Sequence, residues 1–135
     1  MMTFKTSPLK LLIVDDESAI QRILSHYFKD KHEVVTCNNG ADALSWLYKG
    51  NLPDCVIVDM NMPVLNGLDF IHQLRSSGFF NNLPVIVLSG ADNSDTKIKC
   101  LEAGADDFIV KPFNPRELEA RLNAIMRRVQ KPQTV

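Results

Sequence analysis

The sequence lacks a long apolar run, and this absence argues against a membrane-spanning helix. No window approaches the roughly 18 consecutive apolar residues that such a helix needs. Residues Met1–Lys10 are polar and mixed, without the apolar stretch of a secretory signal. An excess of one charge is also missing: the net charge of −1 argues against a strongly basic nucleic-acid-binding surface. We therefore expect a cytoplasmic domain that contacts neither membrane nor nucleic acid.

Cysteine and histidine are both scarce. The three cysteines, Cys37, Cys55 and Cys100, are odd in number and form no C-x-x-C pair, so they indicate neither a disulfide framework nor a zinc site. The three histidines show no ligand-like spacing. We expect reduced and mostly buried thiols, as is usual in the cytosol.

Short apolar runs, by contrast, recur along the chain. With 45% hydrophobic and 23% charged residues, the 135-residue chain has the composition of one globular domain. The runs are continuous rather than alternately apolar and polar, which is typical of strands covered on both faces in a parallel sheet. They predict strands at residues 11–14, 33–37, 55–58, 84–88 and 108–110.

Longer amphipathic segments separate these strands. Apolar residues at helical spacing predict helices within residues 20–28, 43–50, 68–76 and 115–129. A further helix, Ser94–Ala103, has a thin apolar stripe made of Ile98 and Leu101. This alternation predicts an α/β fold, a doubly wound five-stranded parallel sheet of order 2-1-3-4-5 with five helices. We expect a domain at residues 9–130, a disordered tail at 1–8, and at 131–135 a tail or the start of a linker to an output domain.

Polar side chains follow most of the predicted strands, namely Asp15-Asp16, Asp59, Ser89 and Lys111. In a doubly wound sheet, sites form beyond the carboxyl ends of the strands, so we expect these side chains at one rim. Neighbouring carboxylates repel each other, and Mg²⁺ with oxygen ligands relieves the repulsion. A carboxylate beside a metal, an ammonium and a hydroxyl can attack phosphorus and hold a phosphoryl group. Each residue taken singly also fits a plain role as a cap, a turn or a surface lysine.

The segments around these residues carry a family resemblance. They are Leu11–Glu17, Val58–Gly67, Val87–Gly90 and Ala103–Phe113. Together they resemble the receiver domain of two-component response regulators, and Asp59–Gly67 fits the family pattern D-x-x-M-P-x-x-x-G at every fixed position. The last helix and its approach are most similar to the OmpR/PhoB-type branch. The resemblance covers nearly the whole chain and implies the flavodoxin-like receiver fold.

The resemblance implies roles for the residues at the rim. Asp59 would accept a phosphoryl group from a sensor histidine kinase or a phosphotransfer protein, and Lys111 and Ser89 would contact that group. The domain would be a regulatory phosphoacceptor that catalyses its own phosphorylation and dephosphorylation, rather than an enzyme acting on a separate substrate. Its cofactor would be Mg²⁺, bound by Asp15, Asp16, Asp59 and the main-chain carbonyl of Asn61.

The resemblance also implies how the signal leaves the site. Phe108 would be the switch aromatic, turning inward when Ser89 is drawn to the phosphoryl group, and the Lys111–Pro112 peptide bond would be cis. A phosphorylation-dependent homodimer would use the face of the fourth helix, the fifth strand and the fifth helix, as in regulators of transcription. The charged residues at the matching positions are Lys97, Asp107, Glu117 and Arg121.

Other functions compete on the same predicted fold. A haloacid-type phosphatase would carry D-x-D-x-[TV] after the first strand, where this chain has Asp15-Asp16-Glu17-Ser18. A flavodoxin-like nucleotide binder would need a glycine- or hydroxyl-rich phosphate loop there, and acids in that place repel phosphate. A pseudo-receiver that only binds partners would not need the full acidic set and Lys111. The residues therefore favour a phosphorylation-activated signalling switch.

Overall fold

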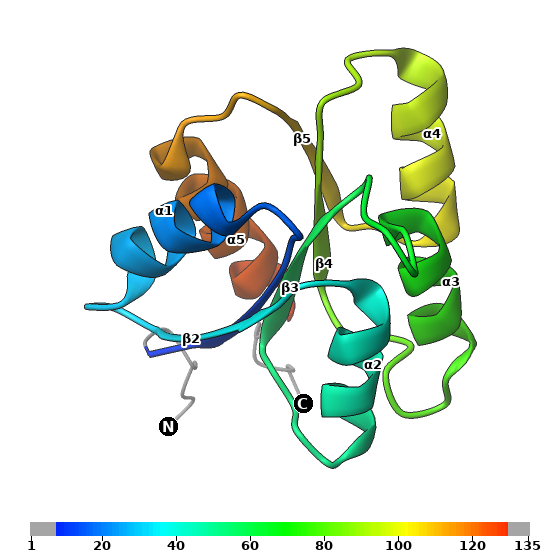
Figure 1. The fold of residues 1–135 in the computed structure, drawn as a ribbon, viewed down its shortest axis with the longest axis horizontal. Coiled ribbons are helices and arrows are strands. Elements are labelled where there is room, and N and C mark those ends of the chain that lie inside the picture. The colour runs from blue at the N-terminus through cyan, green and yellow to red at the C-terminus, as the bar shows by residue number, and fades with distance from the viewer. Residues whose placement is uncertain (1–7, 130–135) are drawn as a thin grey trace, which may run out of the picture.

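The computed structural model describes residues 8–129, in which strands and helices alternate strictly (Figure 1). The predicted strands agree with the observed ones to within one residue at each end. The tails predicted at 1–8 and 131–135 lie outside the described residues, apart from Pro8. The strands are β1 (Lys10–Val14), β2 (Glu33–Cys37), β3 (Cys55–Asp59), β4 (Val85–Ser89) and β5 (Asp107–Val110). The helices are α1 (Ser18–Phe28), α2 (Gly40–Tyr48), α3 (Gly67–Ser76), α4 (Ser94–Ala103) and α5 (Pro115–Val129).

The sheet is parallel throughout, with the order β2-β1-β3-β4-β5, and this confirms the predicted fold. The register pairs Val14 of β1 with Val58 of β3, and Ser89 of β4 with Val110 of β5. Because neighbouring strands run the same way, the carboxyl ends of β1, β3, β4 and β5 meet at one edge. That edge is the rim at which the sequence places its polar groups.

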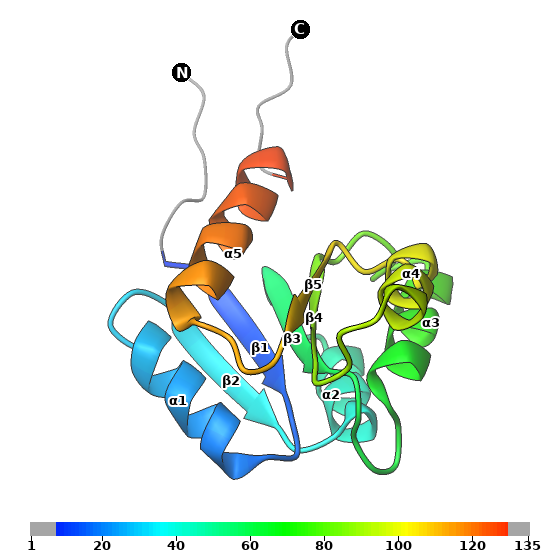
Figure 2. The same ribbon diagram turned by 90° about the horizontal axis from the view of Figure 1, so that it is seen from above.

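Helices cover both faces of the sheet (Figure 2), with α1 and α5 on one face and α2, α3 and α4 on the other. Successive side chains of β1 point to opposite faces. Leu11 and Ile13 pack in the cluster that contains Phe28, whereas Leu12 packs in the cluster that contains Phe70. Both clusters are buried, which explains why the strands read as continuous apolar runs. Within residues 8–129, every helix is too short or too polar to cross a membrane.

Helix α4 is held more weakly than its neighbours. Its buried residue is Cys100, whose Sγ lies 3.5 Å from the Sδ of Met60. Ile98 and Leu101 are 49% and 40% exposed, so the prediction that they form the buried apolar face of this helix is wrong. The inward face is centred on a cysteine, which packs as a small apolar side chain. A helix with so little buried apolar area is easily displaced.

Arg75 of α3 organises the opposite end of the sheet. Its Nη1 donates to the carbonyl oxygen of Leu83 (2.7 Å), and its Nε and Nη2 donate to the carbonyl oxygen of Gly104 (3.0 and 2.7 Å). Nη2 also pairs with Asp106 at 3.3 Å, and that carboxylate accepts the main-chain N–H of Val85 at 2.8 Å. This Arg75 cluster (Arg75, Leu83, Gly104, Asp106) joins the end of α3, the start of β4 and the end of α4.

Glycine is required at the last of these contacts. Gly104 ends α4 with φ +117°, a conformation that other residues rarely adopt. A Cβ at this position would lie 2.7 Å from the Nε of Arg75. The left-handed turn and the approach of the guanidinium therefore both depend on the missing side chain.

Candidate functional site

The carboxyl ends of β1, β3, β4 and β5 bring the predicted rim residues to one place. Asp15 directly follows β1 and is fully buried, and Asp59 ends β3 with 4% exposure. Ser89 ends β4 and is also fully buried, while Lys111 directly follows β5. Asp16 lies beside Asp15 but is exposed. Polar residues this deeply buried need partners, and the rim supplies them.

Lys111 lies at the centre of the site. Its Nζ is 2.9 Å from Oδ1 of Asp59, 3.2 Å from Oε1 of Glu17 and 3.4 Å from Oδ2 of Asp15. The Lys111 side chain is only 16% exposed, so these contacts form in a partly desolvated environment. One ammonium therefore faces carboxylates on three sides, and negative charge predominates.

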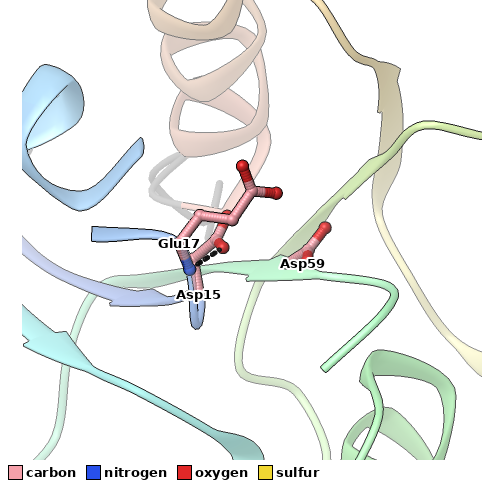
Figure 3. Close-up of side chains that lie close together, drawn as sticks. All are labelled: Asp15, Glu17 and Asp59. Carbon is pink, nitrogen blue, oxygen red and sulfur yellow. Dashed lines mark hydrogen bonds between the residues drawn. The ribbon is translucent and has the colours of Figure 1, made fainter. Parts of the chain in front are cut away.

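Glu17 belongs to the acidic group, although the sequence analysis gave it no role. One oxygen from each of Asp15, Glu17 and Asp59 lies within 4.8 Å of the others, and Figure 3 shows how they gather from the loop after β1 and the end of β3. The main-chain N–H of Glu17 donates to Oδ1 of Asp15 at 2.9 Å. Asp16, predicted as a direct metal ligand, lies outside this group of three. The signal for Glu17 was its place as the third acid in the run after β1.

The pKa values of the site reflect this crowding. Burial raises the pKa of Asp59 above that of an ordinary aspartate; the charges of Asp15 and Asp16 raise it further, and Lys111 opposes them. Burial likewise raises the pKa of Asp15, against the hydrogen bond from Glu17 and the charge of Lys111. Burial alone would lower the pKa of Lys111, but Asp59 and Asp15 hold it above the usual value. The carboxylates are therefore only partly compensated.

The loop after β3 folds back against Asp59. The main-chain N–H of Gly67 donates to the carbonyl oxygen of Met60 at 2.9 Å. A Cβ on Gly67 would lie 2.6 Å from the carbonyl oxygen of Asp59, which explains physically why the motif has glycine there. Val64 has φ +72°, a strained conformation for a β-branched residue. Asn61 lies exposed in the same loop.

The two predicted switch residues are both buried. The Oγ of Ser89 accepts the main-chain N–H of Ala91 at 3.1 Å. Phe108 is 5% exposed and packs in the apolar cluster on the α2–α3–α4 side of the sheet. Phe108 therefore points inward in this conformation. The Lys111–Pro112 peptide bond is cis, as the resemblance implies.

The four predicted interface residues share one face of the domain. Lys97, Glu117 and Arg121 line a groove of about 370 Å³ between α4, β5 and α5. Arg121 binds Asp107 and Glu117 of its own chain, both at 3.1 Å. The charges on this face are therefore partly satisfied within the domain.

The donor set at the rim fits a divalent cation of the Mg²⁺ type. Asp15, Glu17 and Asp59 offer carboxylate oxygens, the ligands that Mg²⁺ prefers. Lys111 supplies a single positive charge among them, so a cation would offset the remaining repulsion. These three acids could therefore hold a metal.

The sequence matches a known protein family and several named proteins. Residues 11–123 match the family described as "Response regulator receiver domain". The chain is 40% identical over 123 residues to "Probable transcriptional regulator ycf27" of Porphyridium aerugineum, covering 90% of this chain and 50% of that protein. It is 39% identical over 122 residues to "Response regulator MprA" of Mycobacterium sp. (strain KMS), covering 90% and 52%. The chain thus spans about half the length of the curated relatives it matches.

Solved structures show the same architecture. The receiver domain of the Francisella response regulator 1452 superposes with a TM-score of 0.82 at 33% sequence identity. That alignment covers 90% of this chain and 98% of the other. The likeness extends across both faces of the sheet and is not confined to the rim.

Proposed function

The chain belongs to the response regulator receiver domain family, and from this premise we propose that it is a phosphorylation-activated signalling switch whose phosphoacceptor is Asp59. The match over residues 11–123 confirms the family predicted from sequence, and the relatives named ycf27 and MprA support the OmpR/PhoB-type branch. A receiver domain of a response regulator works in two-component signalling. We propose that this domain acts in the cytoplasm and that the donor is the phosphohistidine of a sensor histidine kinase or of a phosphotransfer protein. The observation that carries the proposal is the Lys111–Asp59 pair, 2.9 Å apart at a buried rim of carboxylates.

The proposed reaction uses one oxygen of Asp59 as the nucleophile. This oxygen attacks phosphorus and forms a P–O bond while the P–N bond to the donor histidine breaks. The electron pair of that bond goes to the imidazole, which takes a proton from water and leaves as neutral histidine. The ammonium of Lys111 offsets charge on the phosphoryl oxygens. The Oγ of Ser89 already accepts an N–H, so its own O–H is available to donate to the product. The acyl phosphate later loses its phosphoryl group to water, so no separate substrate is involved.

We propose Mg²⁺ as the cofactor of this reaction. Bound Mg²⁺ would offset the negative charge shared by the carboxylates and the phosphoryl group. Asp15 and Asp59 are the buried ligands that we propose, whereas the Glu17 carboxylate, although close to both, pairs with Lys111. Asp16 and the main-chain carbonyl of Asn61 stay in the proposed ligand set because of the family resemblance.

The proposed signal leaves through α4, β5 and α5. We place the first change at Ser89, whose Oγ accepts the Ala91 N–H and would donate its own O–H to a phosphoryl oxygen. Helix α4, with little buried apolar area, is the element expected to shift. A homodimer on this face would require charged side chains to change partners across a two-fold axis. The groups concerned are Lys97, Asp107, Glu117 and Arg121.

Chemical phosphorylation tests the proposal directly. Acetyl phosphate with Mg²⁺ should add one phosphoryl group to the intact protein, and hydroxylamine should remove it because the product is an acyl phosphate. Asp59→Asn should abolish the modification, whereas Asp69→Asn, at an exposed aspartate of α3, should leave it unchanged. Equal labelling of the wild type and Asp59→Asn would overturn the assignment. Sedimentation with and without beryllofluoride would test the proposed dimer separately.

A further inference from the structure

Glu17 occupies an unusual position at the start of α1. It is the N-cap residue, yet its side chain makes no capping hydrogen bond. Its main-chain N–H is held by Oδ1 of Asp15, which fixes where the side chain begins. The carboxylate instead extends over the site and reaches Nζ of Lys111 at 3.2 Å. The Glu17 side chain therefore does not cap helix α1 and binds Lys111 instead.

The ammonium of Lys111 is contacted by three carboxylates in this arrangement: it donates hydrogen bonds to Asp15 and Glu17 and forms an ion pair with Asp59. A lysine carries three N–H donors, and Asp59, Glu17 and Asp15 each place an oxygen within 3.4 Å of Nζ. A phosphoryl oxygen entering the site needs one of these donors. An anionic donor therefore competes with these carboxylates for the ammonium when it binds.

The three carboxylates are not equally able to yield. The side chains of Asp15 and Asp59 are 1% and 5% exposed and leave directly from strand ends. The side chain of Glu17 is 58% exposed and rotates about more bonds. A carboxylate that moves into water regains its hydration, whereas a buried one does not. Glu17 is therefore the group that an incoming anion displaces at least cost.

We propose that Glu17 is a positioning residue that holds the Lys111 ammonium until an anionic phosphoryl donor displaces it, and that it thereby selects against small anionic donors. This inference rests on the function proposed above and adds a specificity element to it. A small donor must displace Glu17 with its own charge alone. A protein donor forms many other contacts and depends less on this single competition.

Phosphorylation rates of matched variants test the competition. With acetyl phosphate below saturation and Mg²⁺ in excess, Glu17→Gln should react about two- to fivefold faster than the wild type, the range expected from losing an exposed ion pair. The maximal rate at saturating donor should change less, because Glu17 competes with the donor rather than taking part in the transfer. Glu102→Gln removes the same charge from an exposed residue of α4 and should react like the wild type.

Glu17→Asp separates direct contact from general repulsion. It keeps the charge but is too short by one methylene, so we expect it to behave like Glu17→Gln. If Glu17→Asp reacts like the wild type, repulsion at the rim explains the rate and the contact with Lys111 does not. If Glu17→Gln reacts no faster than the wild type, the inference is wrong even though labelling of Asp59 stands. If the wild type takes up no phosphoryl group at all, the proposed function itself fails.

A spectroscopic measurement tests the contact without any reaction. In protein free of divalent cations, the ¹⁵Nζ signal of Lys111 can be assigned from its loss in Lys111→Arg. The signal should shift in Glu17→Gln and stay in place in Glu102→Gln. An unchanged signal in Glu17→Gln would show that the lysine is not held by Glu17 in solution, and would overturn the inference independently of the kinetics.

Discussion

Two cations of this domain are almost equally buried but have very different surroundings. The side chains of Arg75 and Lys111 are 19% and 16% exposed. Arg75 meets main-chain carbonyl oxygens and the single carboxylate of Asp106, so its charge is balanced and its acceptors are fixed by the backbone. Lys111 meets the carboxylates of Asp15, Glu17 and Asp59, so its surroundings carry excess negative charge.

This difference separates a stabilising cluster from a reactive one. A buried cation with matched acceptors holds elements together, and removing it strands those acceptors. Acids crowded around one lysine repel each other until a cation or a chemical modification changes their charge. We therefore expect substitutions in the Arg75 cluster mainly to change stability, and those at the Lys111 rim mainly to change chemistry.

The largest expected effect comes from the balanced cluster. Arg75→Ala should lower the free energy of unfolding by about 3 kcal/mol, because partly buried carbonyl oxygens and Asp106 lose their donor. Arg75→Lys keeps the charge but lacks the planar fork, so it should lose about 2 kcal/mol. Urea denaturation measures both. A loss below about 0.5 kcal/mol in Arg75→Ala, as for an ordinary surface residue, would remove the contrast between the clusters.

Lys111→Ala should cost less stability and more function. Without metal, we expect the free energy of unfolding to fall by about 1.5 kcal/mol, a value between those of exposed and buried ion pairs. The loss is limited because the carboxylates left behind can bind water or protons. Millimolar Mg²⁺ should restore part of the lost free energy of unfolding. The response to phosphorylation should be lost in both conditions. Thermal unfolding with and without Mg²⁺ checks the first two effects. A Lys111→Ala protein that unfolds at room temperature would show that the lysine is mainly structural.

Asp59→Asn should change stability in the opposite direction. Burial raises the pKa of this carboxyl, so the folded state binds its proton more tightly than the unfolded state does. Stability contributed by such a group is present at low pH and falls as the pH rises from the usual aspartate pKa through the raised one. Without metal at pH 7, Asp59→Asn should therefore have a higher free energy of unfolding than the wild type, and the difference should vanish in acid. Equal slopes of stability against pH in both proteins would contradict this reasoning.

The smallest expected effect lies on the α4–β5–α5 face. Arg121→Ala removes exposed pairs with Asp107 and Glu117, and the arginine side chain is 44% exposed. We expect a loss of about 0.5 kcal/mol or less, which should disappear in high salt. Denaturation at low and high ionic strength measures it. A loss as large as that of Arg75→Ala would mean that exposure is a poor guide to the role of a cation in this domain.

Strand positions were readable from sequence because both faces of the sheet are buried. In the central strands β3 and β4 every residue is therefore apolar until the carboxyl end, where Asp59 and Ser89 mark the rim. The helix α4 was found at its correct bounds, but its inward face was not. The prediction took Ile98 and Leu101 as the buried face and left Cys100 out of the apolar pattern. In the structure Cys100 is the buried residue of this helix.

The contacts of side chains across loops were harder to predict. Arg75 binds main-chain carbonyl oxygens, and carbonyls carry no signal in a sequence. Glu17 was visible as an acid, but its reach to Lys111 depends on how the loop after β1 is held by Asp15. The inward position of Phe108 likewise depends on packing between strands and helices that a pattern of residues does not fix.

The hydrogen bonds from Arg75 to the carbonyl oxygen of Gly104 also affect how helix α4 can move. They anchor the C-terminal end of α4, whereas the N-terminal end follows Ser89 and Ala91 along the chain. A ten-residue helix is about 15 Å long, so tilting it by about 10° around the anchored end would swing the free end by about 2.6 Å. If α4 tilts in this way, its displacement would be largest at the N-terminal end, near Ser89, and close to zero at Gly104.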